Sequence, residues 1–584
     1  MFKSWLQCHS SWRPRLESLE RRVLPSVLTV SDIADSGIGS LRAAIALANN
    51  GDTIIFALPT PSTINVTSGP LDVEKSIDIA GPGASFLTLQ SNGTSRVFQI
   101  GATNSLAKVT MSGLTITGGQ AIQGAGVNNA ATLTLIGDII TANNNMAAAN
   151  TGGAGVFNSG TMELENTVVS SNTSTATNGG EALGAGIENS GTATLLNSTV
   201  ENNITNALSS GADGGGIESD GTLSLINSFV FNNLAEAGSS DVAFGGGIFN
   251  FGRLAMVGTT LASNSAVKGL GGGLAAEDGT VTLTDCTVAD HNVARVGGGI
   301  AIVSFISTAT LTLNNCTIGG NSTPSGGSGG GLFISSTGSQ TVTIENTIVG
   351  ANIAPTDPDI SGNPTTALFN LISNGSGTNI TNGSNGNIVG VEPLLGPFQN
   401  NGGPTETVAL LPGSPAIDAG SNGLVTTATD QRGLPRIVGK SVDMGASESQ
   451  ARPILVTAGG HGQAPEVKVF EASTGALLLD FDAYDPHFLG GVRVAVGDVN
   501  GDGIPDIITA PGPGGGPDIR VFNGGSGAKT EEFFAYDPRF QAGVFLAAGD
   551  VNGDGLADII TGPDEFSGPD VRVFFAGNIS GKPD

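Results

Sequence analysis

The sequence predicts an all-β protein in which a parallel β-helix solenoid with end caps is followed by an incomplete β-propeller-like module. Three observations predict this fold. Short glycine-rich phrases recur about every 30 residues through the middle of the 584-residue chain. Short segments of alternating apolar and polar residues lie between these phrases, whereas helical periodicity is absent there. A longer repeat of 52 residues fills the C-terminal part.

Two signals with the same spacing mark the shorter repeat. A Gly-Ala-Gly or Gly-Gly-Gly phrase followed by an aliphatic residue recurs at steps of 26 to 32 residues. An aliphatic residue three positions before an asparagine keeps the same spacing, except in one coil where His291 replaces the asparagine. The aliphatic residues of the first signal are Val127, Val156, Ile187, Ile217, Ile248, Leu274, Ile300 and Leu332, and the asparagines of the second are Asn143, Asn172, Asn203, Asn233, Asn264, Asn321 and Asn352.

Segments such as 132–136, 222–226 and 280–284 alternate with a period of two, which buries one face of a strand. Strands that recur at this spacing without helices between them are typical of a solenoid in which each coil pairs with the next. Glycine permits the turns, and asparagine tolerates left-handed geometry and can stack in hydrogen-bonded ladders. We therefore predict coils of a parallel β-helix over 100–392, with an asparagine ladder at one corner.

The two signals resemble the Gly-Gly-Ala-aliphatic and Phe-x-x-Asn repeats of the polymorphic outer membrane protein family and its right-handed β-helix relatives. The resemblance covers roughly 100–355. It departs from the family where Val, Ile or Leu stands in place of Phe. It implies a right-handed β-helix on a surface protein.

Caps are expected at both ends of the solenoid, because its open sheet edges need cover. Residues 27–99 are predicted to form the N-terminal cap and first strands, with a helix over 40–50 that begins at the N-cap Ser40. The phrase SLRAAIALAN there resembles the Cys-Ser-Leu-Arg-Glu-Ala motif that precedes such β-helices. Residues 393–449 are predicted to cap the other end.

The phrases NNGGPT, LLPGSPAIDAG and TDQRGLPR within 393–449 closely resemble the choice-of-anchor Q domain of bacterial surface proteins. Arg432 and Arg436 are expected to pair there with Asp418, Asp430 or Asp443 rather than to act in a binding site.

Residues 1–26 are expected to form a disordered export leader. They lack the continuous apolar stretch of a standard signal peptide. Their phrase LESLERRVLPS resembles the leader at the start of many exported planctomycete proteins. The alternative is a frayed basic tail. The resemblance implies a secreted or cell-surface protein.

The C-terminal part, 453–584, contains two full repeats, 456–507 and 508–559, and a partial one, 560–584. Repeats near 50 residues with four strands are typical of β-propeller blades.

Each full repeat contains a nine-residue loop, DVNGDGIPD at 498–506 and DVNGDGLAD at 550–558. Carboxylate and amide oxygens at alternate positions suit Ca²⁺ when glycine permits a sharp turn. The loops resemble the calcium loops of FG-GAP and VCBS repeats. The alternative is a set of Asx turns that bind no ion. The predicted ligands are Asp498, Asn500, Asp502, the Ile504 carbonyl and Asp506 in the first loop, and Asp550, Asn552, Asp554, the Leu556 carbonyl and Asp558 in the second.

Cys286 and Cys316 occupy the same position in successive coils, where other coils have Thr or Ser. In-register parallel strands give poor disulfide geometry. We therefore favour two stacked thiols over a disulfide.

The charge balance limits the kinds of binding partner that the chain can have. Acidic residues number 51 against 23 basic ones, for a net charge of −28. This balance argues against nucleic acid and anionic membranes as partners and favours divalent cations. No apolar run reaches the length of a transmembrane helix.

No catalytic set is evident from the sequence, so we expect a protein that is not an enzyme. A lyase needs basic residues, but only Arg253, Lys268 and Arg295 occur between positions 119 and 345, at separations that do not favour one patch. Glu188 and Glu218 occupy matching positions of adjacent coils, which we interpret as solvated surface or an incidental cation site rather than as a catalytic pair. His291, next to Asp290, is interpreted as a substitute in the corner ladder rather than as a base.

The sequence-based hypothesis is an exported, adhesive or structural β-helix whose calcium-binding repeats contact extracellular polysaccharide or protein. The alternative is a carbohydrate-active β-helix enzyme, either a polysaccharide lyase or a glycoside hydrolase.

Overall fold

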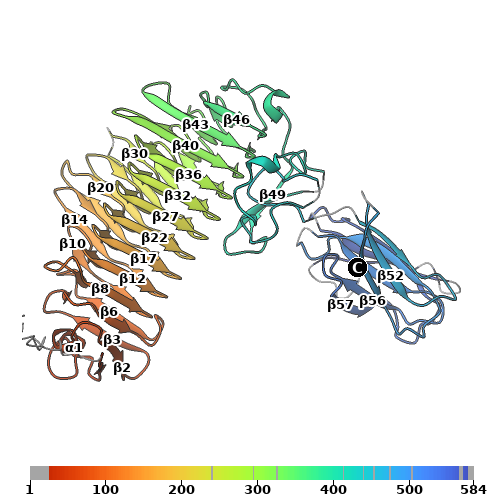
Figure 1. Cartoon of the computed structure of the whole chain (residues 1–584), viewed down its shortest axis with the longest axis horizontal. Helices are drawn as coiled ribbons and strands as arrows, with labels where there is room; N and C mark the ends of the chain where they lie inside the picture. Colours follow the sequence, from red (N-terminus) through yellow and green to blue (C-terminus); the bar gives the residue numbers. More distant parts are fainter. Residues whose placement is uncertain are drawn as a thin grey trace, which may run out of the picture.

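The computed structural model describes residues 25–576 except 239–240, 294, 324–325, 412, 439, 451–453, 473–474, 502–503, 555, 565–567 and 569. The predicted leader, 1–26, lies outside the described residues apart from its last two positions. Figure 1 shows a stack of coils running from α1 to β46, a segment around β49 at its flank, and antiparallel sheets at the C-terminal end. No helix among the described residues is long and apolar enough to cross a membrane.

The predicted all-β parallel solenoid is confirmed. One coil runs through β21 (Ile187–Asn189), β22 (Thr192–Leu196), β23 (Thr199–Glu201), β24 (Ile204–Ala207) and β25 (Ala212–Asp213), and the next begins at β26 (Ile217–Ser219). Each strand pairs in parallel with its counterpart one coil away. We call the sheets that contain β22, β23 and β21 sheets I, II and III; they have 13, 13 and 11 strands.

The three sheets enclose one continuous apolar core. In β22 the side chains of Ala193 and Leu195 point inward and are buried, while the intervening threonines face outward. Val200 of β23 and Ile187 of β21 complete the interior of this coil. The period-two pattern of the sequence therefore corresponds to the inside and outside of the solenoid.

A lateral arm projects from the coils between sheets II and III. It consists of a seven-stranded sheet that includes β24 and a four-stranded sheet that includes β25. Small alanines fill the space between these two sheets, which lets their backbones approach closely. They are Ala176, Ala182, Ala207, Ala212, Ala235, Ala237, Ala243 and Ala266. The shorter of the two sheets lies beside the outer face of sheet III.

The predicted asparagine ladder runs along one corner. The Asn172 side-chain amide donates to Asn203 Oδ1 at 3.0 Å, and Asn203 donates to Asn233 Oδ1 at 3.0 Å. Left-handed backbone occurs at the residue before each ladder asparagine, for example at Asn202 (φ 56°), and not at the ladder residue as expected. A second ladder links Asn129, Asn158 and Asn189 at 2.7 Å each; its sequence signal is an asparagine two positions after the aliphatic residue of the glycine phrase.

His291 takes the place of asparagine in the first ladder, as predicted. Its ring Nδ1 accepts a hydrogen bond from the backbone N–H of Asn264 at 2.9 Å, and the backbone N–H of His291 donates to Asn321 Oδ1 at 3.2 Å. The ring is buried, and Nε2 has no hydrogen-bond partner among the described residues. Burial lowers the pKa of His291 to about 3, so the ring is neutral at physiological pH and has no access to a substrate.

Cys286 and Cys316 are buried free thiols, which confirms the stacked arrangement over a disulfide. The Cys286 thiol donates to the Thr284 carbonyl at 3.2 Å, and the Cys316 thiol donates to the Asn314 carbonyl at 3.3 Å.

The N-terminal helix is α1 (Leu41–Leu47), shorter than the expected 40–50, and Ser40 Oγ accepts the N–H of Ala43 as predicted. The strands β1 (Val27–Val30), β2 (Thr53–Phe56), β5 (Asp78–Ala80) and β8 (Lys108–Ser112) pair successively in parallel in sheet I. The solenoid thus begins at Val27 and continues through position 100 without a boundary.

Residues 393–449, which include β49 (Leu395–Gln399) and β50 (Thr407–Leu410), pack on the outer face of sheet II. The Gln431 amide donates to Thr260 Oγ1 at 2.7 Å, and Thr287 Oγ1 donates to Gln431 Oε1 at 2.6 Å. The N–H of Ala446 donates to Thr317 Oγ1 at 2.9 Å. The segment thereby contacts successive coils along the flank of the solenoid.

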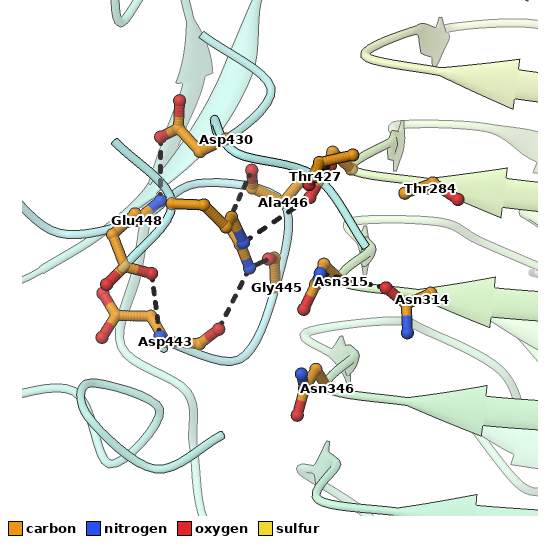
Figure 2. Close-up of polar contacts among 12 residues, drawn as sticks. Thr284, Asn314, Asn315, Asn346, Thr427, Asp430, Asp443, Gly445, Ala446 and Glu448 are labelled. Atoms are coloured by element: carbon orange, nitrogen blue, oxygen red, sulfur yellow. Dashed lines mark hydrogen bonds and ion pairs between the residues drawn. The ribbon is translucent and has the colours of Figure 1, made fainter. Parts of the chain in front are cut away.

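The two arginines of this segment have different partners. Arg432 pairs with Asp430 at 2.7 Å, as predicted. Arg436 forms its ion pair with Asp285 of the solenoid at 3.5 Å, which corrects the expectation that it pairs within the segment. It also donates to the carbonyls of Asp443 and Gly445, and Figure 2 shows these residues beside Asn314, Asn315 and Asn346 of the coils. The partner was missed because Asp285 lies about 150 residues away in a solenoid corner.

The C-terminal module has three antiparallel sheets of three, four and three strands. The four-stranded sheet, β54 (Val492–Gly497), β55 (Asp506–Pro511), β56 (Asp518–Phe522) and β57 (Lys529–Phe534), crosses the predicted repeat boundary at 508. The others are β51 (Ile454–Ala458) with β52 (Glu466–Glu471) and β53 (Leu477–Asp482), and β58 (Val544–Gly549) with β59 (Asp558–Pro563) and β60 (Arg572–Phe574).

Replacing His291 with asparagine should restore the ladder and make stability less sensitive to acid. A free histidine has a pKa near 6.5, so between about pH 6.5 and 3 the unfolded chain binds a proton that the native ring does not. Wild-type stability therefore falls as the pH falls, by up to about 1.4 kcal/mol per pH unit from this group. The melting-temperature advantage of His291→Asn should be larger at pH 5 than at pH 7.5; an equal difference at both pH values would contradict this account.

Replacing Asp285 with alanine should loosen residues 393–449 from the solenoid. The change leaves the Arg436 guanidinium buried without its carboxylate, at a cost of about 3–5 kcal/mol. Limited proteolysis should cleave the segment faster, whereas Asp78→Ala, at an exposed carboxylate of sheet I, should leave the cleavage rate unchanged. Equal protease resistance in the two variants would show that this ion pair does not hold the segment.

Candidate functional site

Glu188 and Glu218 are the central residues of a ladder on the outer face of sheet III. The strands β16 (Val156–Asn158), β21, β26 and β31 (Ile248–Asn250) pair in register, so that Phe157, Glu188, Glu218 and Phe249 follow one another across the coils. Within each strand the flanking residues, such as Ile187 and Asn189, are buried in the interior. The glutamates therefore project outward, on the side that faces the lateral arm.

Both glutamates are buried despite this outward direction, with 7% of each residue exposed. The expectation of solvated surface is thus wrong. The lateral arm covers the two side chains, and a glycine in the arm leaves the space that the Glu188 side chain occupies. A Cβ added at Gly152, in β15 (Thr151–Gly152), would lie 1.9 Å from Glu188 Oε2.

The arm contributes a third carboxyl group. Asp213 of β25 lies in a ladder between Leu183 of β20 (Ala182–Leu183) and Phe244 of β30 (Ala243–Phe244). The rings of Phe244 and Phe249 lie 5.6 Å apart, so the two ladders meet one coil beyond Glu218. We call Glu188, Asp213 and Glu218 the carboxyl cluster.

Burial raises the pKa of all three carboxyl groups. Burial, with Asp220 nearby, raises the pKa of Glu188 to about 7. Burial, with Glu181 and Glu277 nearby, raises that of Asp213 to about 8. The pKa of Glu218 is raised well above its usual value by burial and by Glu188, Asp220 and Asp213. The cluster can therefore hold protons at neutral pH.

The hydrogen bonding distinguishes the two glutamates. The Gln123 side-chain amide donates to Glu188 Oε1 at 3.4 Å, while Oε2 has no partner among the described residues. Within the described part of the chain, Glu218 accepts no hydrogen bond, and Asp213 Oδ1 has no partner. Because hydrogen bonds to a carboxylate favour its ionised form, Glu188 ionises more readily than Glu218.

The basic residues of the solenoid lie elsewhere. Arg253 is exposed on sheet I. Lys268 and Arg295 lie in neighbouring turns of the lateral arm, because Leu270 pairs with Val296, so their separation of 27 residues is close to one coil there. None of the three is among the groups that shift the pKa values of the carboxyl cluster.

The predicted metal loops connect β54 to β55 and β58 to β59. Asp498 Oδ1 accepts the N–H of Gly501 at 2.8 Å, and Asp550 Oδ1 accepts that of Gly553 at 2.7 Å, each from three residues further along the chain. Asn552 Oδ1 accepts the N–H of Asp554 at 2.9 Å, which is an Asx turn. The buried Asp506 and Asp558 accept the N–H groups of Val499 and Val551. Asp502 lies outside the described residues.

The donor types in both loops fit Ca²⁺, which prefers carboxylate and carbonyl oxygens. The other residues predicted as ligands, Asn500, Ile504, Asn552, Asp554 and Leu556, also lie in these loops, and the Asn552 amide donates to Asp554 Oδ2 at 2.8 Å. No three acidic, histidine or cysteine side chains within the described ranges gather as a metal site. The loops border a cavity of about 570 Å³ that is also lined by residues of 393–449 such as Arg432 and Glu448.

Comparisons with known proteins identify an FG-GAP-like repeat at residues 488–561. The solved structures that the chain resembles include full-length tailspike protein 2 of an Escherichia coli O157:H7 bacteriophage, at 11% identity and a TM-score of 0.26, covering 86% of this chain and 70% of that one. They also include the enzymatically active domain of tailspike protein 2 from bacteriophage CBA120, at 12% identity and a TM-score of 0.25, covering 86% and 79%. No curated protein sequence matches the chain.

These findings correct the expectation that the chain is not an enzyme, because one of the resembled structures is described as an enzymatically active domain. At these identities and TM-scores the resemblance assigns no reaction and no residue to this chain. The comparisons identify neither the planctomycete leader nor the polymorphic outer membrane protein and choice-of-anchor Q families, so these resemblances stay predictions.

Replacing Glu188 with glutamine should stabilise the protein at alkaline pH. Because the pKa is near 7 in the native state and near 4.5 when exposed, the native protein keeps a proton that the unfolded chain releases in this interval. Wild-type stability from this group falls as the pH rises from about 4.5 to 7, by up to about 1.4 kcal/mol per pH unit. The melting temperature of Glu188→Gln relative to wild type should rise over this interval, while Glu163→Gln, at an exposed site on sheet I, should show no such trend. A flat difference for Glu188→Gln would contradict the burial effect.

Proposed function

We propose that this chain is a surface protein that hydrolyses glycosidic bonds in extracellular polysaccharide. The observation that carries the proposal is the in-register pair of buried carboxyl groups, Glu188 and Glu218. Neighbouring strands of a sheet lie about 4.8 Å apart. Retaining glycosidases hold their two carboxyl groups about 5–5.5 Å apart, so the pair has the spacing of a retaining enzyme.

Their surroundings assign a role to each glutamate. Glu218 has no hydrogen-bond donor among the described residues and lies near three other acids, so it keeps its proton and serves as the general acid. Glu188 accepts a hydrogen bond from Gln123, which supports its ionised form, and serves as the nucleophile.

In the first step Glu188 forms a bond to the anomeric carbon while the bond to the leaving oxygen breaks, and the Glu218 proton moves to that oxygen. In the second step a water molecule attacks the anomeric carbon, its proton moves to Glu218, and the bond to Glu188 breaks. Both carboxyl groups return to their starting states.

The aromatic residues beside the pair support a sugar polymer as the substrate. Phe157 lies one coil before Glu188, and Phe249 with Phe244 lies one coil after Glu218. Flat apolar rings suit the apolar faces of sugar rings. Phe157 and Phe244 are half-buried and can provide such a contact on each side of the carboxyl pair, whereas Phe249 is buried.

Hydrolysis is favoured over the lyase reaction. A lyase needs a basic side chain or a cation beside the sugar acid, and none of Arg253, Lys268 and Arg295 influences the carboxyl cluster.

The predicted export leader supports a cell-surface or secreted location, where polysaccharide is available.

The C-terminal FG-GAP-like repeats are proposed to bind Ca²⁺ and to attach the protein to polysaccharide or protein at the surface. The donor set of the loops at 498–506 and 550–558 supports this role. Adhesion through these repeats would hold the solenoid against its substrate.

The purified chain should release reducing ends from a panel of neutral, acidic and amine-bearing polysaccharides. Glu218→Gln should lower the rate by about 10²–10⁴-fold, because it removes the general acid, and Glu188→Gln should lower it at least as far. Glu163→Gln, an exposed substitution on sheet I, should retain wild-type rates. Absence of turnover on every polymer by the folded wild-type protein would overturn the proposal.

Calcium should raise the melting temperature of the C-terminal repeats, because an ion that binds only the native state stabilises it. The double variant Asp502→Ala with Asp554→Ala should lose this shift, since it removes a central carboxylate from each loop. Differential scanning calorimetry with Ca²⁺ and with a chelator checks it. A calcium shift of unchanged size in the double variant would show that the loops do not hold the ion.

A further inference from the structure

Three further acidic residues lie near the carboxyl cluster. Asp220 follows the strand that carries Glu218, Glu181 precedes the arm strand β20, and Glu277 ends β35 (Leu274–Glu277). All three raise the pKa of at least one cluster member, and no basic side chain contributes to any of these shifts. An anionic polymer would therefore be repelled here.

The cluster also has oxygen atoms that lack donors. Glu188 Oε2 and Asp213 Oδ1 are buried and have no hydrogen-bond partner within the described ranges, and Glu218 accepts no hydrogen bond there. Glu188 and Glu218 are each 7% exposed. Buried acceptors without donors are unfavourable, so a ligand that brings donors gains affinity by supplying them.

A protonated primary amine supplies what the cluster lacks. An ammonium group carries three N–H donors and a positive charge, so it can bond to several carboxyl oxygens at once and lower the pKa values of the groups that it contacts. Hydroxyl groups of a neutral sugar provide donors without the charge. A divalent metal needs several oxygen ligands around one point, and no three acidic side chains among the described residues are arranged in that way.

We propose that the carboxyl cluster selects polysaccharides that carry protonated primary amines, such as polymers of hexosamine without N-acetyl groups. The amine of a sugar beside the cleavage point would lie against Asp213 and Glu188, with the half-buried Phe157 and Phe244 contacting the neighbouring rings. This inference rests on the proposed function for the position of the polymer, but selective binding does not require cleavage.

The test compares two probes of equal length, a glucosamine hexamer and an N-acetylglucosamine hexamer, with a galacturonate hexamer as the anionic probe. Isothermal titration calorimetry of the full chain at pH 6 should give at least tenfold tighter binding of the glucosamine hexamer than of either other probe. The preference should weaken as salt is added, because it depends on charge. Equal or tighter binding of the N-acetylated or anionic probe would overturn the inference.

The residues are tested with Asp213→Asn, which removes the carboxyl group that would ionise against the bound ammonium while leaving the proposed acid and nucleophile in place. This variant should lose most of the preference for the amine-bearing hexamer and keep its affinity for the N-acetylated one. Glu163→Gln, the exposed control on sheet I, should keep the full preference. If Asp213→Asn keeps its melting temperature and still prefers the glucosamine hexamer, the carboxyl cluster is not what recognises the amine.

Turnover is measured in parallel, so that the two proposals fail separately. Selective binding of the glucosamine hexamer without release of reducing ends would uphold amine recognition and overturn hydrolysis. Cleavage of all three hexamers at similar rates and affinities would uphold hydrolysis and overturn amine selectivity.

Discussion

The in-register stacking of one coil on the next is the constraint from which the other features of the solenoid follow. Each ladder asparagine donates hydrogen bonds from its side-chain amide and from its backbone N–H to the side chain one coil away. Asn172, for example, donates both to Asn203 Oδ1. A slip of one residue in the register would separate these amides from their partners. It would also move the inward apolar residues of each strand to the outer face. With the register held, every side chain lies beside its counterpart one coil away, whether it is a cysteine, an alanine of the arm or a glutamate.

Stacking of like charges is unfavourable, yet the carboxyl cluster places two acidic side chains at matching positions of adjacent coils. Glu188 and Glu218 are adjacent in register, and the lateral arm covers all but 7% of each residue's surface. Gly152 is small enough to admit the Glu188 side chain, so the arm is shaped to cover a carboxyl group there. Buried ionisable groups without partners cluster at functional sites, because structural positions seldom tolerate their cost.

The flanking segment and the C-terminal module extend the solenoid by other means. Residues 393–449 attach through polar side chains that reach between coils, such as Gln431 between Thr260 and Thr287. The ion pair between Arg436 and Asp285 is buried, and burial of either charge without the other would be unfavourable. The segment and the predicted metal loops of the C-terminal repeats line one cavity together.

The sequence by itself determined the coil, because the requirements of a repeated turn act locally. Glycines, inward aliphatic residues and ladder asparagines recur with the period of the coil, and so do Cys286 and Cys316. The matching positions of Glu188 and Glu218 were equally visible in the sequence. Their burial was not, because it depends on an arm whose strands lie beside sheet III only in the folded chain. Arg436 illustrates the same limit, since its partner Asp285 comes from a distant coil. The tertiary structure alone decided these features, because desolvation of a charge depends on everything that surrounds it and not on its neighbours in sequence.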